Sequence, residues 1–331
     1  FALLAIPLFI LSGQLMGQGG IAHRLSDFAK SIVGMLPGGL AFVHVFSCSL
    51  FGAISGSSVA ATSAIGSFMM PTMEEDGYPK EFNAALTAAA STTGLLIPPS
   101  NILIVYAVAS GGVSISALFL GGYLPGILVA LSLMVVSALY AKKYNFPAGD
   151  RVKLSVVLQK SIAALPSLFL IVLVIGGILG GIFTATEAGA IAVLYALVLS
   201  VFIYKEVAFS ELGDILLKAT RTTAIVMLLV ATSMAMSWIL AFENIPTMAA
   251  ETLLALSENP IVILLIINLI LLLVGAFLDM TPAVLIFTPI FLPVAVALGM
   301  TPLHFGIMMV LNLSIGLCTP PVGSVLFVAC A

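Results

Sequence analysis

Residues that carry side-chain oxygens gather in four short groups in a chain that is otherwise almost entirely apolar. Each group combines hydroxyl, amide or carboxylate side chains with glycine or proline: Ser55-Gly56-Ser57-Ser58, Pro98-Pro99-Ser100-Asn101, Asp279-Met280-Thr281-Pro282 and Thr319-Pro320-Pro321-Val322-Gly323. Adjacent prolines remove backbone donors and force the preceding residues out of helical geometry, so that carbonyl oxygens are freed. Sodium is a hard ion that takes such oxygens, and broken helices supply them in membrane transporters. The groups therefore predict sodium as a coupling ion, with ligands from Ser55, Gly56, Ser58, Pro98, Ser100, Asn101, Asp279, Thr281, Thr319, Pro320 and Gly323.

The small residues at 55–58 also suit an anionic substrate. Backbone amides at the start of a following helix carry the positive end of its dipole, which favours a carboxylate. We expect the substrate carboxylate between the first and third groups, near Ser55, Ser57, Ser58, Ser100, Asp279 and Thr281. The alternative is that the small residues only let helices pack closely. The double proline on the partner segment favours the binding interpretation.

Asp279 is the most informative single residue, because it lies in an otherwise uncharged apolar stretch. A carboxylate at membrane depth costs several kcal/mol unless it is paired, and by default it marks a functional site. No Lys or Arg is expected on that side of the membrane, so a bound cation is the simplest partner. The alternative is that Asp279 only braces a helix end.

The composition indicates a helical membrane protein. Apolar residues make up 61% of the chain and charged residues 8%, with a mean hydropathy of +1.26. Apolar runs of about 20 residues can cross a bilayer as helices, and they lack the two-residue alternation of barrel strands. Three cysteines without ligand-like spacing are expected to be small apolar residues.

Enzymatic functions find little support in the sequence. No His-Glu-x-x-His or glycine-rich phosphate loop is present. Ser57 with His44 as its base would suit an intramembrane serine protease only if the two were hydrogen-bonded. Neither an enzyme, an organic cofactor nor a nucleic-acid partner is expected.

A repeat organises the chain, since the pattern from Leu50 to Pro99 returns about 223 residues later, from Leu273 to Pro321. Paired, interrupted apolar segments of this kind point to the midplane site of a secondary transporter. We predict an all-α polytopic membrane protein of two inverted repeats, each with a re-entrant helical hairpin and a broken helix. The boundaries are 1–108 for the first repeat (hairpin 53–72, break 98–101), 109–223 for connecting spans and cytoplasmic surface segments, and 224–331 for the second repeat (hairpin 276–298, break 319–323).

The distribution of basic residues supports this topology. Three connecting spans are expected, near 115–140, 162–182 and 185–204. Because this is an odd number of crossings, the second copy has the opposite orientation in the membrane. All eleven Lys and Arg then fall in predicted cytoplasmic segments: Arg24, Lys30, Lys80, Lys142, Lys143, Arg151, Lys153, Lys160, Lys205, Lys218 and Arg221. This is the positive-inside pattern. Residues 205–221 are expected to form a separate surface segment before a span at 224–241.

Four motifs resemble the large membrane subunit of TRAP (tripartite ATP-independent periplasmic) transporters. They are Phe51-Gly52-Ala53-Ile54-Ser55-Gly56-Ser57-Ser58-Val59-Ala60, Ile97-Pro98-Pro99-Ser100, Thr186-Glu187-Ala188-Gly189-Ala190 and Thr319-Pro320-Pro321-Val322-Gly323. The resemblance covers essentially the whole chain, and the motifs are specific in combination. It implies a multi-pass protein of a bacterial or archaeal inner membrane that takes up organic acids by a sodium-driven, elevator-type movement.

The resemblance also implies two partners, a small membrane subunit and a periplasmic substrate-binding protein. Asn101 after Pro-Pro-Ser favours a sialic acid system, while C4-dicarboxylates and keto acids stay open. One alternative is a single-component sodium/dicarboxylate symporter, which needs no binding protein. A channel or assembly subunit is the other, and saturable sodium-dependent uptake would separate it from a transporter.

Overall fold

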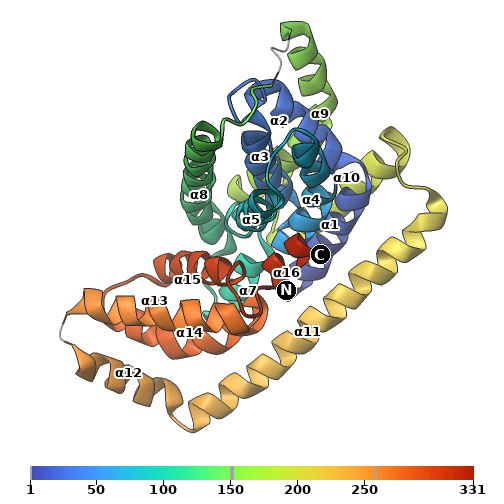
Figure 1. Cartoon of the computed structure of the whole chain (residues 1–331). Coiled ribbons are helices and arrows are strands. Elements are labelled where there is room, and N and C mark those ends of the chain that lie inside the picture. The colour runs from blue at the N-terminus through green and yellow to red at the C-terminus, as the bar shows by residue number, and fades with distance from the viewer. Residues whose placement is uncertain (1, 150–152, 258) are drawn as a thin grey trace.

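The computed structural model describes residues 2–149, 153–257 and 259–331, and regular structure within these ranges is helical. The helices form two groups, one from the first third of the chain and one from the last (Figure 1). A long diagonal helix, α11, runs along one side of the molecule between the two groups (Figure 1). All-helical architecture with several apolar helices confirms the predicted fold class.

The first part of the chain alternates long helices with short breaks. Its helices are α1 (Ala5–Gln18), α2 (Ile21–Val33), α3 (Gly39–Ser55), α4 (Ser58–Glu75), α5 (Lys80–Ser91), α6 (Thr93–Leu96) and α7 (Asn101–Ala109), preceded by the short η1 (Ala2–Leu4). α1 and α2 meet at an angle of 68°. Gly20, with φ of 69°, makes this corner.

α3 and α4 form a helical hairpin whose tip is residues 55–57. The hairpins predicted at 53–72 and 276–298 are thus displaced, because residues 58–72 and 280–297 each lie in a single helix and the preceding span forms the other arm. Gly56 takes a φ of 61°, a left-handed conformation that glycine adopts without steric cost. Ser57 is extended, and its side chain accepts a hydrogen bond from the amide of Ala60 at 3.3 Å. Glycine therefore ends one helix and serine caps the next, which turns the chain within three residues.

The span after this hairpin is interrupted at the double proline. α6 ends at Leu96, α7 begins at Asn101, and the helices on the two sides differ in direction by 52°. The Pro98–Pro99 peptide bond is cis. Ser100 is extended, and its hydroxyl donates to the carbonyl of Leu95 at 2.6 Å.

The middle of the chain supplies long helices, and one of them differs from the sequence expectation. They are α8 (Ile115–Tyr144), α9 (Leu154–Leu179), α10 (Ala185–Leu197) continued by η2 (Val198–Ile203), η3 (Phe209–Glu211) and α11 (Leu212–Phe242). The prediction of a separate surface segment is wrong for residues 212–221, because they belong to α11. This helix has 31 residues, or about 46 Å, so its polar first turns extend beyond an apolar core of about 30 Å. Near its other end, Trp238 and Phe242 stack with ring centroids 5.7 Å apart.

The last part of the chain repeats the pattern of the first. Its helices are α12 (Ile245–Leu256), α13 (Pro260–Phe277), α14 (Met280–Ala297), α15 (Pro302–Gly316) and α16 (Ser324–Cys330). α13 and α14 are separated by two extended residues, Leu278 and Asp279. The Pro320–Pro321 bond between α15 and α16 is cis, like its counterpart in the first part.

One close glycine contact joins each hairpin to its broken helix. Gly52 of α3 lies so close to Gly94 of α6 that a Cβ on either would overlap the backbone of the other. Gly275 of α13 and Gly316 of α15 meet in the same way, with a Cβ on Gly316 only 2.6 Å from the Cα of Gly275. The members of each pair occupy matching positions of the repeated pattern.

The last half-helix of each part packs against helices of the other part. α7 packs against α14, and α16 packs against α4 and α5. Each half-helix that follows a double proline thus contacts the hairpin of the other part, and α7 and α16 are seen near the middle of the molecule (Figure 1). This packing brings the two breaks and the two tips toward one region.

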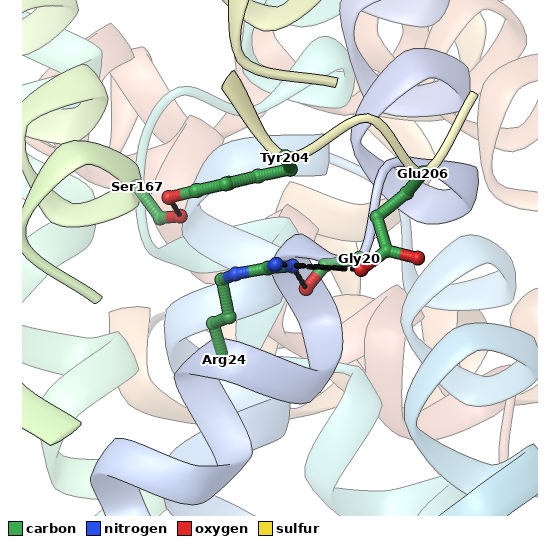
Figure 2. Close-up of polar contacts among 5 residues, drawn as sticks. All are labelled: Gly20, Arg24, Ser167, Tyr204 and Glu206. Atoms are coloured by element: carbon green, nitrogen blue, oxygen red, sulfur yellow. Dashed lines mark hydrogen bonds and ion pairs between the residues drawn. The ribbon is translucent and has the colours of Figure 1, made fainter. Parts of the chain in front are cut away.

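Arg24 on α2 connects this helix, through polar contacts, to the segment that follows α10 and η2. The guanidinium of Arg24 donates to the carbonyl of Gly20 at 3.0 Å and forms an ion pair with Glu206 at 3.3 Å. It also lies 3.8 Å from the centroid of the Tyr204 ring, and the Tyr204 hydroxyl is 3.0 Å from that of Ser167 on α9 (Figure 2). The charge of Arg24 is therefore held between neighbouring elements.

The chain is a multi-pass membrane protein. Among the described residues, six helices are long and apolar enough to cross a membrane, and two bent pairs raise the number to eight. The bent pairs are α1 with α2 and the helices on either side of the first double proline. Arg151, counted above among the cytoplasmic basic residues, lies outside the described residues.

Candidate functional site

A cavity of about 750 Å³ lies where the two hairpin tips approach each other. The first tip contributes residues 55–58, the first break contributes Asn101, and the second tip contributes Asp279, Met280 and Thr281. The second break contributes Ser324, which follows the predicted ligand Gly323. Residues that are more than 200 positions apart in the sequence thus line one space.

The first tip and the first break are in direct contact. A Cβ on Gly56 would lie 2.8 Å from the carbonyl oxygen of Pro99 and 3.1 Å from the amide nitrogen of Asn101. Only glycine fits this approach, since its φ is also positive. Ser55 and Ser58 are 2% and 3% exposed, and Ser100 is fully buried. The protein therefore encloses this group of oxygens.

Asn101 is the residue of the first break with an unused acceptor. Its side-chain carbonyl oxygen is buried and has no hydrogen-bond partner among the described residues. A buried polar atom without a partner costs about 1–3 kcal/mol, which a bound ion or water would offset. Ser100, by contrast, does not line the cavity, and its hydroxyl is bonded to Leu95.

Asp279 at the second tip is exposed in the described structure, which differs from the expectation of a carboxylate enclosed in apolar surroundings. The hydroxyl of Ser324 donates to its carboxylate at 3.2 Å. Asp279 forms no ion pair with the residues that the structure describes. Ser324 was not among the predicted ligands, although it directly follows the second break. The contact joins the second tip to the second break, as Gly56 joins the first pair.

The second break itself presents backbone oxygens rather than side chains. A Cβ on Gly323 would lie 2.9 Å from the carbonyl oxygen of Thr319 and 3.0 Å from that of Leu317, so these two oxygens converge. The Thr319 hydroxyl is bonded to the carbonyl of Ile315 at 2.9 Å. Thr319 and Pro320 are exposed, and Pro98, Thr319, Pro320 and Gly323 do not line the cavity.

The cavity also contains polar residues that the motifs did not identify. Beyond the tips it is lined by Gln14, Gln18, His23, Ser67, Lys218 and Thr222. Several of these residues could be noticed in the sequence, because they are polar residues four positions apart in apolar helices. Residues at that spacing share one helix face. Recognising that pattern as part of a site requires knowing which helices surround the cavity.

His44 does not form the serine–histidine pair that a protease would need. It is fully buried on α3 and lies outside the cavity lining. Neither of its ring nitrogens has a hydrogen-bond partner among the described residues.

Comparisons with known proteins give a consistent result. The model of the family "Tripartite ATP-independent periplasmic transporter, DctM component" matches residues 1–331. The chain is 56% identical to the uncharacterized protein YgiK of Salmonella typhimurium over 331 residues, all of this chain and 76% of that protein. It is 43% identical to the C4-dicarboxylate TRAP transporter large permease protein DctM of Pseudomonas aeruginosa over 331 residues, all of this chain and 77% of that protein.

A solved structure shows a related fold at much lower sequence identity. The YdaH transporter of Alcanivorax borkumensis superposes with a TM-score of 0.55 and 16% identity. The match covers 98% of this chain and 77% of that one.

Proposed function

Because the chain belongs to the DctM component family of tripartite ATP-independent periplasmic transporters, we propose that it carries an organic acid anion into a bacterial cell by sodium symport. The observation that supports this most directly is the cavity that both hairpin tips share with Asn101 and Ser324, the residues that begin the helices after the two double prolines. Secondary transporters bind their cargo and ions between such discontinuous helices near the middle of the membrane.

Two sodium sites are proposed, one for each break. The first uses the oxygens of Ser55–Ser58 with Asn101 and the carbonyls around Pro98 and Ser100, where Asn101 has a free acceptor. The second uses the Asp279 carboxylate, Thr281 and the carbonyls between Thr319 and Gly323, where the Thr319 oxygen converges with that of Leu317. Both sets consist of oxygen ligands, which suit a hard cation.

The substrate carboxylate is proposed to lie between the tips, near the amides at the start of α4 and near Ser57 and Thr281. Relatives named for a C4-dicarboxylate, isethionate, sialic acid and 2,3-diketo-L-gulonate are 43%, 43%, 41% and 38% identical to the chain. Because these values span so narrow a range, identity alone does not choose among the acids. The substrate class is therefore a small organic anion.

The movement is proposed to be of the elevator type, with two inverted repeats. Hairpins α3–α4 and α13–α14 and the broken helices form the mobile unit, since the glycine pairs and the packing of the half-helices hold them together. The remaining spans and surface segments form the scaffold in the inner membrane. A small membrane subunit and a periplasmic binding protein are proposed as partners, and one relative is an isethionate permease named DctMQ.

Reconstituted uptake tests this function. Proteoliposomes with the partner subunits and the binding protein would be offered succinate, sialic acid, 2,3-diketo-L-gulonate or isethionate. We expect one of these acids to enter only with an inward sodium gradient, and a monoanion to enter faster when the interior is negative. Two sodium ions with a monoanion move one net charge, to which 100 mV adds about 2.3 kcal/mol. Equal uptake with a proton gradient in sodium-free buffer would contradict sodium coupling, and uptake without the binding protein would favour a single-component symporter.

A further inference from the structure

The cavity continues past the hairpin tips toward the predicted cytoplasmic side. Along α4 it is lined from Ser58 to Ser67, and along α11 from Val226 back to Lys218. At 1.5 Å per residue these stretches extend for about 14 Å and about 12 Å. The end that contains Ser67 and Lys218 lies near the cytoplasmic termini that the distribution of basic residues predicts for α4 and α11.

Three helices line this part of the cavity with polar residues at the same spacing. Each contributes two residues four positions apart, so that both lie on one face: Gln14 and Gln18 on α1, Ser63 and Ser67 on α4, and Lys218 and Thr222 on α11. His23 on α2 adds a ring that packs against Phe68 with centroids 4.1 Å apart. Polar residues on otherwise apolar helices indicate a path for a hydrated solute rather than contact with lipid.

Lys218 supplies the positive charge of this path. It is the only Lys or Arg among the cavity-lining residues that the structure describes. Arg24, which follows His23 in the sequence, is engaged by Glu206 and Tyr204 and does not line the cavity (Figure 2). Lys218 forms no ion pair with the described residues, including Asp214 one turn earlier on α11.

We propose that Lys218, with Gln18 and His23, forms an anion site at the cytoplasmic end of the cavity that takes the carboxylate or sulfonate group of the transported acid as it leaves the hairpin tips. The inference rests on the proposed function for the identity of the cargo. The negative charge of Asp279 at the hairpin-tip end and the positive charge of Lys218 at the cytoplasmic end give the cavity a polarity. After sodium has left Asp279, this polarity drives an anion toward the cytoplasm.

Charged thiol reagents test the anion site without knowledge of the substrate. Ser67→Cys would be placed in a background with Cys318→Ser and Cys330→Ser, which leaves the buried Cys48. Inside-out vesicles would be treated with anionic sulfonatoethyl methanethiosulfonate or with its cationic trimethylammonium counterpart. Lys218→Gln should lower the ratio of anionic to cationic labelling rates by about threefold to tenfold, as expected for the loss of one unit charge within about 10 Å.

Two variants control for charge and for folding. Arg221→Gln removes the same charge one turn away on α11, outside the cavity lining, and should leave the labelling ratio unchanged. Lys218→Arg keeps the charge and should preserve the ratio. An unchanged ratio in Lys218→Gln, or an equal fall in Arg221→Gln, would overturn the proposal.

Efflux measurements connect this site to transport. In proteoliposomes loaded with whichever of the four acids is transported, Lys218→Gln should raise the half-saturating concentration on the cytoplasmic side by about threefold or more. The sodium dependence of uptake should stay the same, because both sodium sites lie at the other end of the cavity. If none of the acids is transported, the proposed function fails, while the labelling ratio still decides whether Lys218 binds anions. If Lys218→Gln alters the labelling ratio but leaves efflux unchanged, the site binds anions but does not take the transported acid.

Discussion

The first break lies inside the protein, whereas the second lies at its surface, although both share a glycine, a double proline and a neighbouring hairpin tip. At the first, Ser100 is fully buried and Ser55 and Ser58 are nearly so. At the second, Asp279, Thr319 and Pro320 are exposed. The enclosed group is neutral, and the exposed group contains the carboxylate.

The difference follows from the cost of burial. Hydroxyl and amide groups can be buried when they are hydrogen-bonded, as Ser100 is to Leu95. An isolated carboxylate loses far more free energy when it leaves water. Asp279 therefore lies in contact with solvent, and in the proposed second sodium site a bound ion would compensate its charge when the site closes. On this proposal the first site is enclosed before its ion binds, and the second is completed by its ion.

Replacing Asp279 should produce the largest effect. Asp279→Asn keeps the size and one carbonyl oxygen but removes the charge, so sodium binding should weaken by about 2 kcal/mol, or about 30-fold. Uptake at ordinary sodium should collapse and recover partly at much higher sodium. The melting temperature should hardly change, because the side chain is exposed. Superimposable sodium titrations of the variant and the wild type would remove Asp279 from the site.

The first break should respond less strongly, because its backbone oxygens survive side-chain replacement. Ser100→Ala with Asn101→Ala should weaken sodium binding by about 1–2 kcal/mol. The loss of the Ser100 bond to Leu95 should also lower the melting temperature slightly. Initial rates of uptake against sodium, beside thermal unfolding in the same sodium series, measure both effects. A double variant with an unchanged sodium dependence would show that neither side chain is a ligand.

Replacing the glycines of the two close contacts should lower the stability of the protein. Gly94→Ala and Gly316→Ala each place a methyl group against the backbone of the opposite glycine, which should destabilise the protein by about 1–3 kcal/mol. Gly213→Ala is a suitable control, since it lies on α11 with open space around it. It should be neutral or stabilising by up to about 1 kcal/mol. Differential scanning fluorimetry of the three variants would show whether the two halves depend equally on these contacts.

The smallest effect is expected at Ser324. Ser324→Ala removes a single exposed hydrogen bond to Asp279, so sodium affinity should fall by about 0.5–1 kcal/mol, or about twofold to fivefold. Combining it with Asp279→Asn should add almost nothing, because the partner charge has already gone. Additive losses would mean that Ser324 binds sodium independently of Asp279.

The breaks and tips could be predicted from sequence, whereas the rest of the cavity could not. Gly56, Asn101 and Asp279 stood out because glycine, double proline and a lone carboxylate each have a local physical meaning. Gln14, Gln18 and Lys218 did not, since their roles depend on which helix faces share the cavity. The sequence did not predict the length of α11, because polar residues 205–221 indicate a separate surface segment before the span, while a continuous helix can project from the membrane into water.

Because α11 projects beyond the apolar core of the membrane, the thickness of the bilayer should affect transport. The apolar part of α11 is bounded by Arg221 at one end and by the exposed Trp238–Phe242 stack at the other, and such residues anchor a helix at the lipid headgroups. The stretch from Thr222 to Phe242 spans about 30 Å, which matches an average hydrocarbon core. A thicker or thinner bilayer would tilt or shift α11, and Lys218 would change its height relative to the hairpin tips. Lipids of different acyl-chain length should therefore alter efflux more than sodium affinity.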